Sequence, residues 1–253
     1  MKQQGNNSIF RAFQILSLLS ERDEDMGVAE LGRTLGLNKS TVHRFLTSLR
    51  DLGIVQKNEK TNKYHLGLTL FELGNRVPIK RTLIDKIHPH LLDLAFQVNE
   101  VVNLAGLFKN EVVYLDKIES KRSVQIMTYV GFHIPPHSTA LGKAILAFMN
   151  PEDVQRILRP TGLPKFTNRT ITEMDALLAE LRKIHTQGFA LDNEEFEEGL
   201  RCVAVPLFDS RGEVLASISI SGSTARIHEE TVPFYFDALK KTREKIRQSL
   251  FTL

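Results

Sequence analysis

The sequence predicts an α+β protein made of an N-terminal winged helix-turn-helix domain, a linker helix and a C-terminal domain with an antiparallel sheet. Three observations predict this fold class: two short amphipathic segments joined by a glycine-containing turn, a strand–turn–strand run directly after them, and a long remainder with several strand-like runs and short turns. The length of 253 residues fits about two domains. We expect the three parts to span residues 1–66, 67–80 and 81–253.

Two short helices should open the first domain. The first is marked by an apolar stripe that would close a small core, formed by Ile9, Phe10, Phe13, Leu16 and Leu19. In the second, Val28, Leu31 and Leu35 share one face. Gly36-Leu37-Asn38 then forms a tight connection, and Asn38 is a good N-cap for a third helix.

The third helix has two chemically different faces. Its apolar positions fall at i, i+3, i+4 and i+7, namely Val42, Phe45, Leu46 and Leu49. The opposite face carries side chains that can donate hydrogen bonds to phosphates and base edges: Lys39, Ser40, Thr41, His43, Arg44 and Thr47. A recognition helix needs this division, because one face docks on its own domain while the other enters a major groove.

A basic hairpin is expected next and would form the wing. Residues 54–57 and 63–66 are strand-like around a polar turn, and the hairpin carries Lys57, Lys60 and Lys63. From Leu31 to His65 there are seven Lys/Arg and two acids, although the whole chain has a formal net charge of only +3. Three packed helices with an ordinary solvated face would also be amphipathic. The turn, the hairpin and the local charge favour binding to double-stranded DNA.

The linker helix is expected from Leu66 to Val77, before Pro78 interrupts it. Its apolar residues could pack on their own domain or on a second copy of the chain. We favour a dimer contact, because two heads related by a two-fold axis can read a palindromic operator. The expected assembly is therefore a homo-oligomer, with homodimer and homotetramer both open.

The C-terminal part predicts one sheet with helices outside it. Expected strands span residues 101–107, 112–118, 124–130, 189–191, 202–208 and 214–221. Expected helices span residues 81–98, 140–149, 151–158, 172–186 and 229–250. Strands that follow one another through short turns are typical of an antiparallel sheet.

Several motifs follow one another along nearly the whole chain. They are Lys39-Ser40-Thr41-Val42-His43-Arg44, Tyr64-His65-Leu66-Gly67, residues 138–144, residues 192–195, residues 199–206 and Ser217 to Gly222. In this order they resemble the IclR family of bacterial transcriptional regulators, and the acidic run 192–199 is most similar to the KdgR-like subgroup. The resemblance implies a GAF-like effector domain, a homo-oligomer and a small carboxylic-acid effector, such as 2-keto-3-deoxygluconate or a related 2-oxo acid.

The resemblance also implies an effector pocket. Its lining would include the positions Ala140, Leu141, Gly142, Asp192, Cys202, Ser219 and Ser221. The residues alone leave two readings of the strand 214–221 open, because its same-face serines could meet solvent or a polar ligand. The helix that starts at Ser138 or Thr139 is either an ordinary capped helix or a seat for a carboxylate, and Gly142 would let a ligand approach closely. Asp192 would repel a carboxylate, so we expect it to accept from ligand hydroxyls or to hold its loop.

Catalytic, metal and membrane functions find little support in the sequence. Glu194, Glu195, Glu197 and Glu198 form a run that is typical of a solvated loop, and no nucleophile accompanies it. Cys202, His133, His137 and Asp192 match no metal motif, so neither a metal nor a cofactor is expected. The single cysteine and the lack of a run of about 18 apolar residues favour a cytoplasmic protein without a membrane partner.

The sequence therefore predicts a ligand-responsive DNA-binding regulator, a repressor of a sugar-acid or organic-acid catabolic operon. The alternative is a small-molecule-binding protein or an enzyme of organic-acid metabolism whose basic head is incidental. The segment from Leu37 to Leu66 separates the two hypotheses, because an enzyme does not need a basic helix followed by a hairpin.

Overall fold

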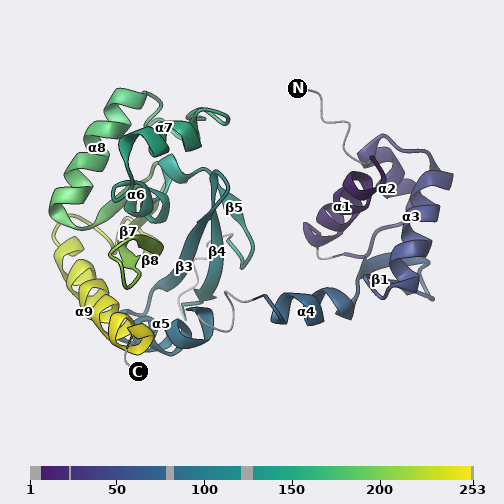
Figure 1. The fold of residues 1–253 in the computed structure, drawn as a ribbon, viewed down its shortest axis with the longest axis horizontal. Coiled ribbons are helices and arrows are strands. Elements are labelled where there is room, and N and C mark those ends of the chain that lie inside the picture. Colours follow the sequence, from purple (N-terminus) through teal and green to yellow (C-terminus); the bar gives the residue numbers. More distant parts are fainter. Residues whose placement is uncertain (1–6, 23, 78–82, 121–127, 252–253) are drawn as a thin grey trace. The chain divides into compact units, whose positions relative to one another are not determined.

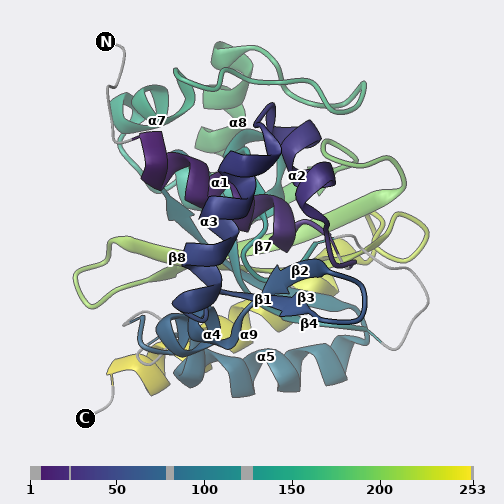
Figure 2. The ribbon, with the colours of Figure 1, turned by 90° about the vertical axis from the view of Figure 1, so that its right-hand side faces the viewer.

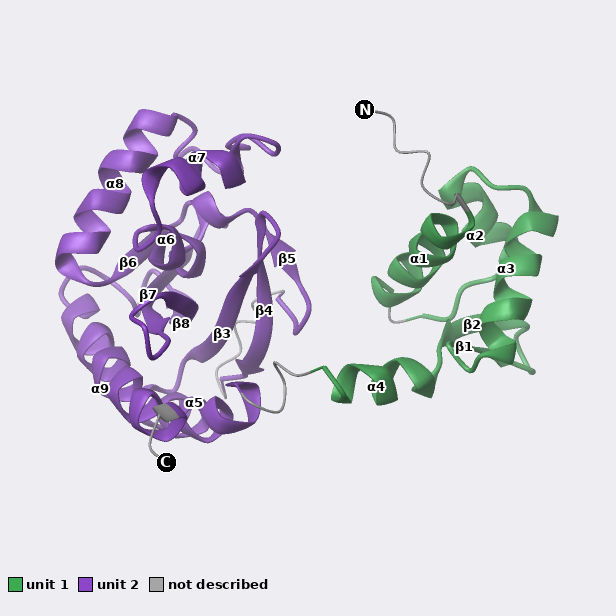
Figure 3. Ribbon diagram, in the orientation of Figure 1, with its two compact units in different colours: residues 1–81 green, residues 82–253 purple. Residues whose placement is uncertain are grey.

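The computed structural model describes residues 7–22, 24–77, 83–120 and 128–251. The chain divides into two compact units, residues 1–81 and residues 82–253 (Figure 3). Each unit has its own hydrophobic core, and each is described by itself below. The predicted α+β fold class, with a winged helix-turn-helix domain followed by a domain with an antiparallel sheet, is confirmed.

The N-terminal unit, called the head below, is a small helical domain with a two-stranded hairpin (Figure 1). Its elements are α1 (Asn7–Ser20), α2 (Val28–Leu35), α3 (Lys39–Asp51), β1 (Val55–Asn58), β2 (Lys63–Leu66) and α4 (Leu68–Asn75). The strands pair antiparallel, with Val55 opposite Leu66. A backbone bridge between Met26 and Tyr64 joins this hairpin, the wing, to the segment before α2. The bridge therefore holds the wing against the rest of the N-terminal unit.

The turn between α2 and α3 is tight because two glycines permit it. Gly36 ends α2 in the left-handed region, at φ 64°, where a side chain would be strained. A Cβ on Gly32 would lie 2.8 Å from the carbonyl oxygen of Leu37, so only glycine lets the turn pack this closely. Asn38 then caps α3 as predicted, since its side chain accepts a hydrogen bond from the backbone N–H of Thr41.

Two expectations for the head are wrong in detail. Ile9, Phe10 and Phe13 are exposed rather than buried, and the core contact of α1 comes from Ile15, with Leu18 and Leu19. The apolar surface of α1 is therefore wider than the face that the small core covers. Leu66 lies in β2 rather than in the linker helix, and α4 starts only after Gly67.

The C-terminal unit, called the body below, is built on an antiparallel sheet with strand order β5-β4-β3-β8-β7-β6 among the described residues. Its strands are β3 (Val101–Phe108), β4 (Glu111–Ile118), β5 (His133–Ile134), β6 (Ala190–Asn193), β7 (Leu200–Phe208) and β8 (Val214–Ser223). Its helices are α5 (Asp85–Val98), the 3-10 helix η2 (Pro136–Ser138), α6 (Ala140–Leu146), α7 (Pro151–Leu158), α8 (Met174–Gln187) and α9 (Val232–Phe251).

The two faces of this sheet carry separate cores. Helices α5 and α9 lie side by side over one face, where alternate β8 residues such as Ile218 and Ile220 pack (Figures 1 and 2). Helices α6, α7 and α8 cover the other face, against residues such as Tyr114 and Ala204. Because successive strand residues point to opposite faces, the serines of β8 point toward the α6 side.

Most predicted elements of this unit are confirmed with small shifts in their ends. The expected strand 124–130 is wrong where it can be checked, because residues 128–130 are not strand and residues 124–127 lie outside the described residues. The short β5 and η2 were not predicted, since two or three residues leave no periodicity to detect. Within the described part of the chain, none of the helices combines the length and the apolar character needed to span a membrane.

Candidate nucleic-acid interface and small-molecule cavity

Helix α3 presents the polar face that its sequence predicts. Val42, Leu46 and Leu49 are buried in the core of the head, with Val42 and Leu46 at 0 % exposure. On the other side Lys39, Ser40, His43 and Arg44 are exposed, and Thr41 and Thr47 are half-buried. The Ser40 hydroxyl donates to Asn38 Oδ1, so it keeps only its acceptor capacity for a partner.

The wing adds positive charge beside this helix in the same unit. Lys60 is exposed at the hairpin turn, while Lys57 and Lys63 are half-buried on the strands. The ammonium of half-buried Lys57 lies 3.7 Å from the carboxylate of exposed Glu59. Exposed cations next to an exposed helix face form the electrostatic footprint of phosphate binding.

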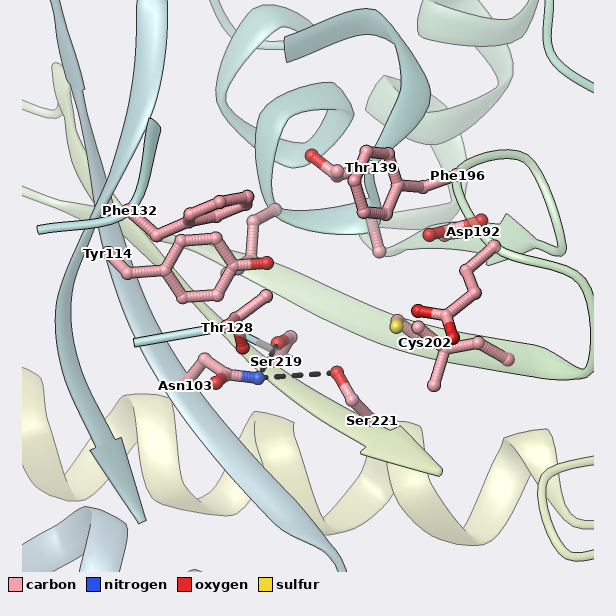
Figure 4. Close-up of a pocket in the computed structure, with 14 residues that line it drawn as sticks. Asn103, Tyr114, Thr128, Phe132, Thr139, Asp192, Phe196, Cys202, Ser219 and Ser221 are labelled. Carbon is pink, nitrogen blue, oxygen red and sulfur yellow. Dashed lines mark hydrogen bonds between the residues drawn. The ribbon is translucent and has the colours of Figure 1, made fainter. Parts of the chain in front are cut away.

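The C-terminal unit contains a cavity of about 290 Å³ between the sheet and α6 (Figure 4). Its volume is at the lower end of the range usual for small-molecule sites. Residues from β3, β4, β6, β7, β8, α6 and the loops around them line it: Asn103, Tyr114, Thr128, Phe132, Thr139, Ala140, Leu141, Asp192, Phe196, Glu197, Leu200, Cys202, Ser219 and Ser221. The structure thus brings together every predicted effector residue except Gly142.

The serines of β8 are buried, which excludes the solvent-facing interpretation. Ser217 and Ser219 have no exposed surface, and Ser221 is 4 % exposed. Ser217 Oγ donates to the backbone oxygen of Leu141 at 3.0 Å and so fixes α6 on the sheet. Ser219 and Ser221 line the cavity instead.

Helix α6 begins at the wall of the cavity. Thr139 is its N-cap and accepts a hydrogen bond from the backbone N–H of Gly142. Ala140 and Leu141 line the cavity, whereas Gly142 does not. A Cβ on Gly142 would lie 2.1 Å from the carbonyl oxygen of Pro136, so the close approach that requires this glycine is made by η2. The approach of a ligand to Gly142 stays a prediction.

Asp192 lies at the edge of the cavity in a buried group of charges. It accepts a hydrogen bond from the backbone N–H of Glu195 at 2.8 Å. Burial, helped by the neighbouring Glu195 carboxylate, raises the pKa of Asp192 to about 7. Glu195 is 6 % exposed and pairs with the fully buried ammonium of Lys143, so this part of the acidic run is not the solvated loop that its sequence suggested.

The remaining walls of the cavity are aromatic and weakly polar. Phe132 packs on Tyr114, with ring centroids 6.1 Å apart, and the Tyr114 hydroxyl points into the cavity (Figure 4). Burial raises the pKa of the Tyr114 phenol and of the Cys202 thiol, so both are neutral at physiological pH. Among the described lining residues there is no Lys or Arg, so hydroxyls and backbone N–H groups must meet any ligand anion there.

The family follows from two models that match this chain. The model of the IclR helix-turn-helix domain matches residues 8–59, and that of the bacterial transcriptional regulator IclR C-terminal domain matches residues 77–248. The chain belongs to the IclR family. As a member it is a ligand-responsive, DNA-binding transcriptional regulator.

Three relatives of this IclR-family regulator cover nearly its whole length. The HTH-type transcriptional regulator KdgR of Escherichia coli is 38% identical over 240 residues, which is 95% of this chain and 91% of that protein. The transcriptional repressor IclR of Escherichia coli is 31% identical over 227 residues, or 89% and 83%. The crystal structure of an IclR homolog from Microbacterium hydrocarbonoxydans, complexed with 4-hydroxybenzoate, matches with a TM-score of 0.85, 26% identity and coverage of 96% and 98%.

The sequence did not point to several of the regulator's cavity residues. Asn103, Tyr114, Thr128 and Phe132 lie between the motifs of the N-terminal part and those of the C-terminal part, which begin at residue 138. One signal was present for Asn103, because it is the single polar side chain in the otherwise apolar run from Val101 to Phe108. A polar residue in a strand buried on both faces needs either an internal partner or a ligand.

Proposed function

We propose that this protein represses a sugar-acid or organic-acid catabolic operon and releases its operator when a small carboxylic acid enters the C-terminal cavity. The observation that carries the proposal is the cavity itself, because it is lined by buried hydroxyls and is part of the same chain as an exposed basic helix. The likeness to KdgR supports 2-keto-3-deoxygluconate, or a related 2-oxo acid, as the effector.

On the DNA side, α3 would enter the major groove and the wing would contact the backbone. Lys39, Ser40, Thr41, His43, Arg44 and Thr47 would meet base edges and phosphates from the exposed face of α3. Lys57, Lys60 and Lys63 would contact phosphates, which gives affinity without sequence preference. Specificity would then depend mainly on α3.

The exposed face of α4 supports a homodimer. Leu68 and Leu73 are 68 % and 57 % exposed, Val77 just after the helix is 46 % exposed, and none of the residues of α4 is buried in its own unit. An apolar helix that its own core does not cover is suited to pair with its copy. Two heads joined in this way would read a palindromic operator, and the helix would transmit the effector signal from body to head.

On the effector side, Ala140, Leu141, Asp192, Cys202, Ser219 and Ser221 would contact the ligand, and Gly142 would support the wall behind them. The backbone N–H groups at the start of α6 would donate to the carboxylate. With its pKa near 7, Asp192 would carry a proton part of the time, which reduces its repulsion of an anionic ligand.

The proposal is tested with the full-length protein and operator DNA selected from genomic fragments. Fluorescence anisotropy would follow the complex while 2-keto-3-deoxygluconate is added, and a thermal-shift assay would follow ligand binding to the free protein. We expect a higher melting temperature together with a fall of about 5- to 150-fold in operator affinity. Ligand binding without any change in operator affinity would contradict the regulatory role, and absence of binding would contradict the ligand class.

A further inference from the structure

One end of the cavity is made of neutral polar side chains that belong to neighbouring strands. Asn103 on β3 lies directly opposite Ser219 on β8 in the antiparallel register. The Asn103 amide nitrogen donates to Ser219 Oγ at 3.2 Å and to Ser221 Oγ at 3.3 Å (Figure 4). Thr128 reaches the same end from the loop before β5.

Two buried polar atoms at this end have no hydrogen-bond partner in the described part of the protein: Asn103 Oδ1 and Thr128 Oγ1. Asn103 is 1 % exposed and Thr128 is 9 % exposed, so bulk water does not readily compensate for the missing bonds. Buried polar atoms are nearly always paired in folded proteins, and each unpaired atom destabilises the fold. Two such atoms on residues that line one cavity indicate groups that a ligand completes.

At the opposite end of the cavity, two side-chain oxygens already have hydrogen-bond partners within the protein. Asp192 Oδ1 accepts from the Glu195 backbone, and Thr139 Oγ1 accepts from the backbone N–H of Gly142. Among the buried side-chain atoms of the described lining residues, those without a hydrogen-bond partner are Asn103 Oδ1 and Thr128 Oγ1.

The chemistry of these two atoms restricts what can bind. An amide oxygen only accepts hydrogen bonds, so the group that meets Asn103 Oδ1 must be a donor. A ligand hydroxyl donates to it and can also accept from Thr128 Oγ1. A carboxylate, a keto oxygen or an alkyl chain would leave Asn103 Oδ1 unpaired.

We propose that Asn103 and Thr128, supported by Ser219, form a hydroxyl-recognition end of the cavity, so that the effector is a small acid with at least one hydroxyl away from its carboxylate. The inference rests on the proposed function and narrows its ligand class. Asn103 thereby becomes the residue that distinguishes hydroxylated acids from acids of the same length without hydroxyls.

The test compares two probes of equal carbon number with the full-length protein by isothermal titration calorimetry. The first probe is 2-keto-3-deoxygluconate, and the second is 2-oxohexanoate, which has the same 2-oxo acid group and no hydroxyl. We expect the wild type to prefer the hydroxylated probe by roughly ten- to hundred-fold, because the other probe leaves buried polar atoms unpaired.

Two variants test which residues cause the preference for the hydroxylated probe. Asn103→Leu keeps the approximate size of the side chain and removes the acceptor, so affinity for the hydroxylated probe should fall roughly ten-fold or more while affinity for 2-oxohexanoate stays the same or rises. Thr128→Val removes only a hydroxyl and should lower the preference by a smaller factor. It also keeps the proposal testable if Asn103→Leu does not fold.

Ser223→Ala is the matched control, because Ser223 Oγ is also buried and unpartnered in the described structure, on the same strand but outside the cavity lining. The Ser223→Ala variant should prefer the hydroxylated probe by the same factor as the wild type. Equal affinities of the wild type for both probes would overturn this inference and leave the proposed ligand class intact, since Asn103 and Thr128 would then bind water rather than ligand. Binding of neither probe would overturn both proposals.

Discussion

Both units of this regulator place polar side chains opposite an apolar face, but they use them differently. In α3 the polar face is exposed, and Arg44 and His43 are accessible to a partner. In β8 the polar face is buried, so Ser217 and Ser221 must find partners inside the protein or in a ligand. Exposed polar residues therefore reveal a partner through their charge and pattern, whereas buried ones reveal it through the hydrogen bonds they lack.

The same contrast applies to charges. In the head, the ion pair of Arg50 with Asp51 is exposed and contributes little to stability. In the body, Lys143 and Glu195 are almost fully buried beside Asp192, next to the cavity. The following predictions test this comparison.

The largest effect is expected for Lys143→Met, which leaves the Glu195 carboxyl buried without its partner. Removal of one member of a buried pair destabilises a fold by about 3–5 kcal/mol, and urea unfolding of the full-length protein would measure it. Lys183→Met is the matched control, since Lys183 pairs with Glu180 on the surface of α8. A loss for Lys143→Met no larger than for this control would show that the buried pair does not hold α6 to its neighbouring loop.

A smaller effect is expected for Arg44→Ala in the head. Loss of a base or phosphate contact should reduce operator binding by about 1–3 kcal/mol per half-site, without a change in stability, because Arg44 lies outside the core. Anisotropy titrations measure the affinity. Lys60→Gln serves as the comparison, because a wing lysine should weaken binding to all sequences and reduce the salt slope by about 1. Unchanged operator affinity in Arg44→Ala would show that Arg44 does not contact the operator.

The pH dependence of the body tests the buried carboxyl. Folded Asp192, with its pKa near 7, keeps a proton up to that pH, whereas an unfolded Asp loses it near pH 4. The folded state thus binds more protons between these values, and its stability falls as pH rises, by about 2 kcal/mol between pH 5 and pH 7. Asp192→Asn should remove most of this fall in urea unfolding experiments.

Asp209→Asn is the control for that profile. Backbone N–H groups of Glu213 and Arg211 lower the pKa of Asp209, so its titration lies below this pH window. Its variant should keep the wild-type slope between pH 5 and pH 7. A wild-type slope that persists in Asp192→Asn would mean that another group takes up the proton.

The sequence predicted the two faces of α3 and the two faces of β8 well, because periodicity determines both. The i, i+3, i+4 pattern of Val42, Phe45 and Leu46 identifies the inner face of α3, and strict alternation along β8 separates Ser219 from Ile220. Periodicity could not show that the face of Ser219 is covered by α6, because that depends on a contact across 76 positions, between Ser217 and Leu141.

The rest of the cavity was missed for the same reason. Asn103 and Thr128 are far apart from the family motifs in the chain, and only the pairing of β3 with β8 brings Asn103 to the serines. The pairing of Lys143 with Glu195 likewise joins two elements that lie 52 positions apart. Local sequence contains no record of such contacts, so Glu195 was predicted to be solvated.

The measurement that tests the central claim most directly is effector-induced operator release from a variant that lacks two hydroxyls of the cavity. Ser219→Ala combined with Ser221→Ala removes two hydroxyls from the cavity and leaves α3 and the wing unchanged. We predict that this double variant binds the operator with wild-type affinity in anisotropy titrations, and that 2-keto-3-deoxygluconate releases the wild type but not the double variant. Release of the double variant at the same ligand concentration as the wild type would contradict the account and place the effector site elsewhere.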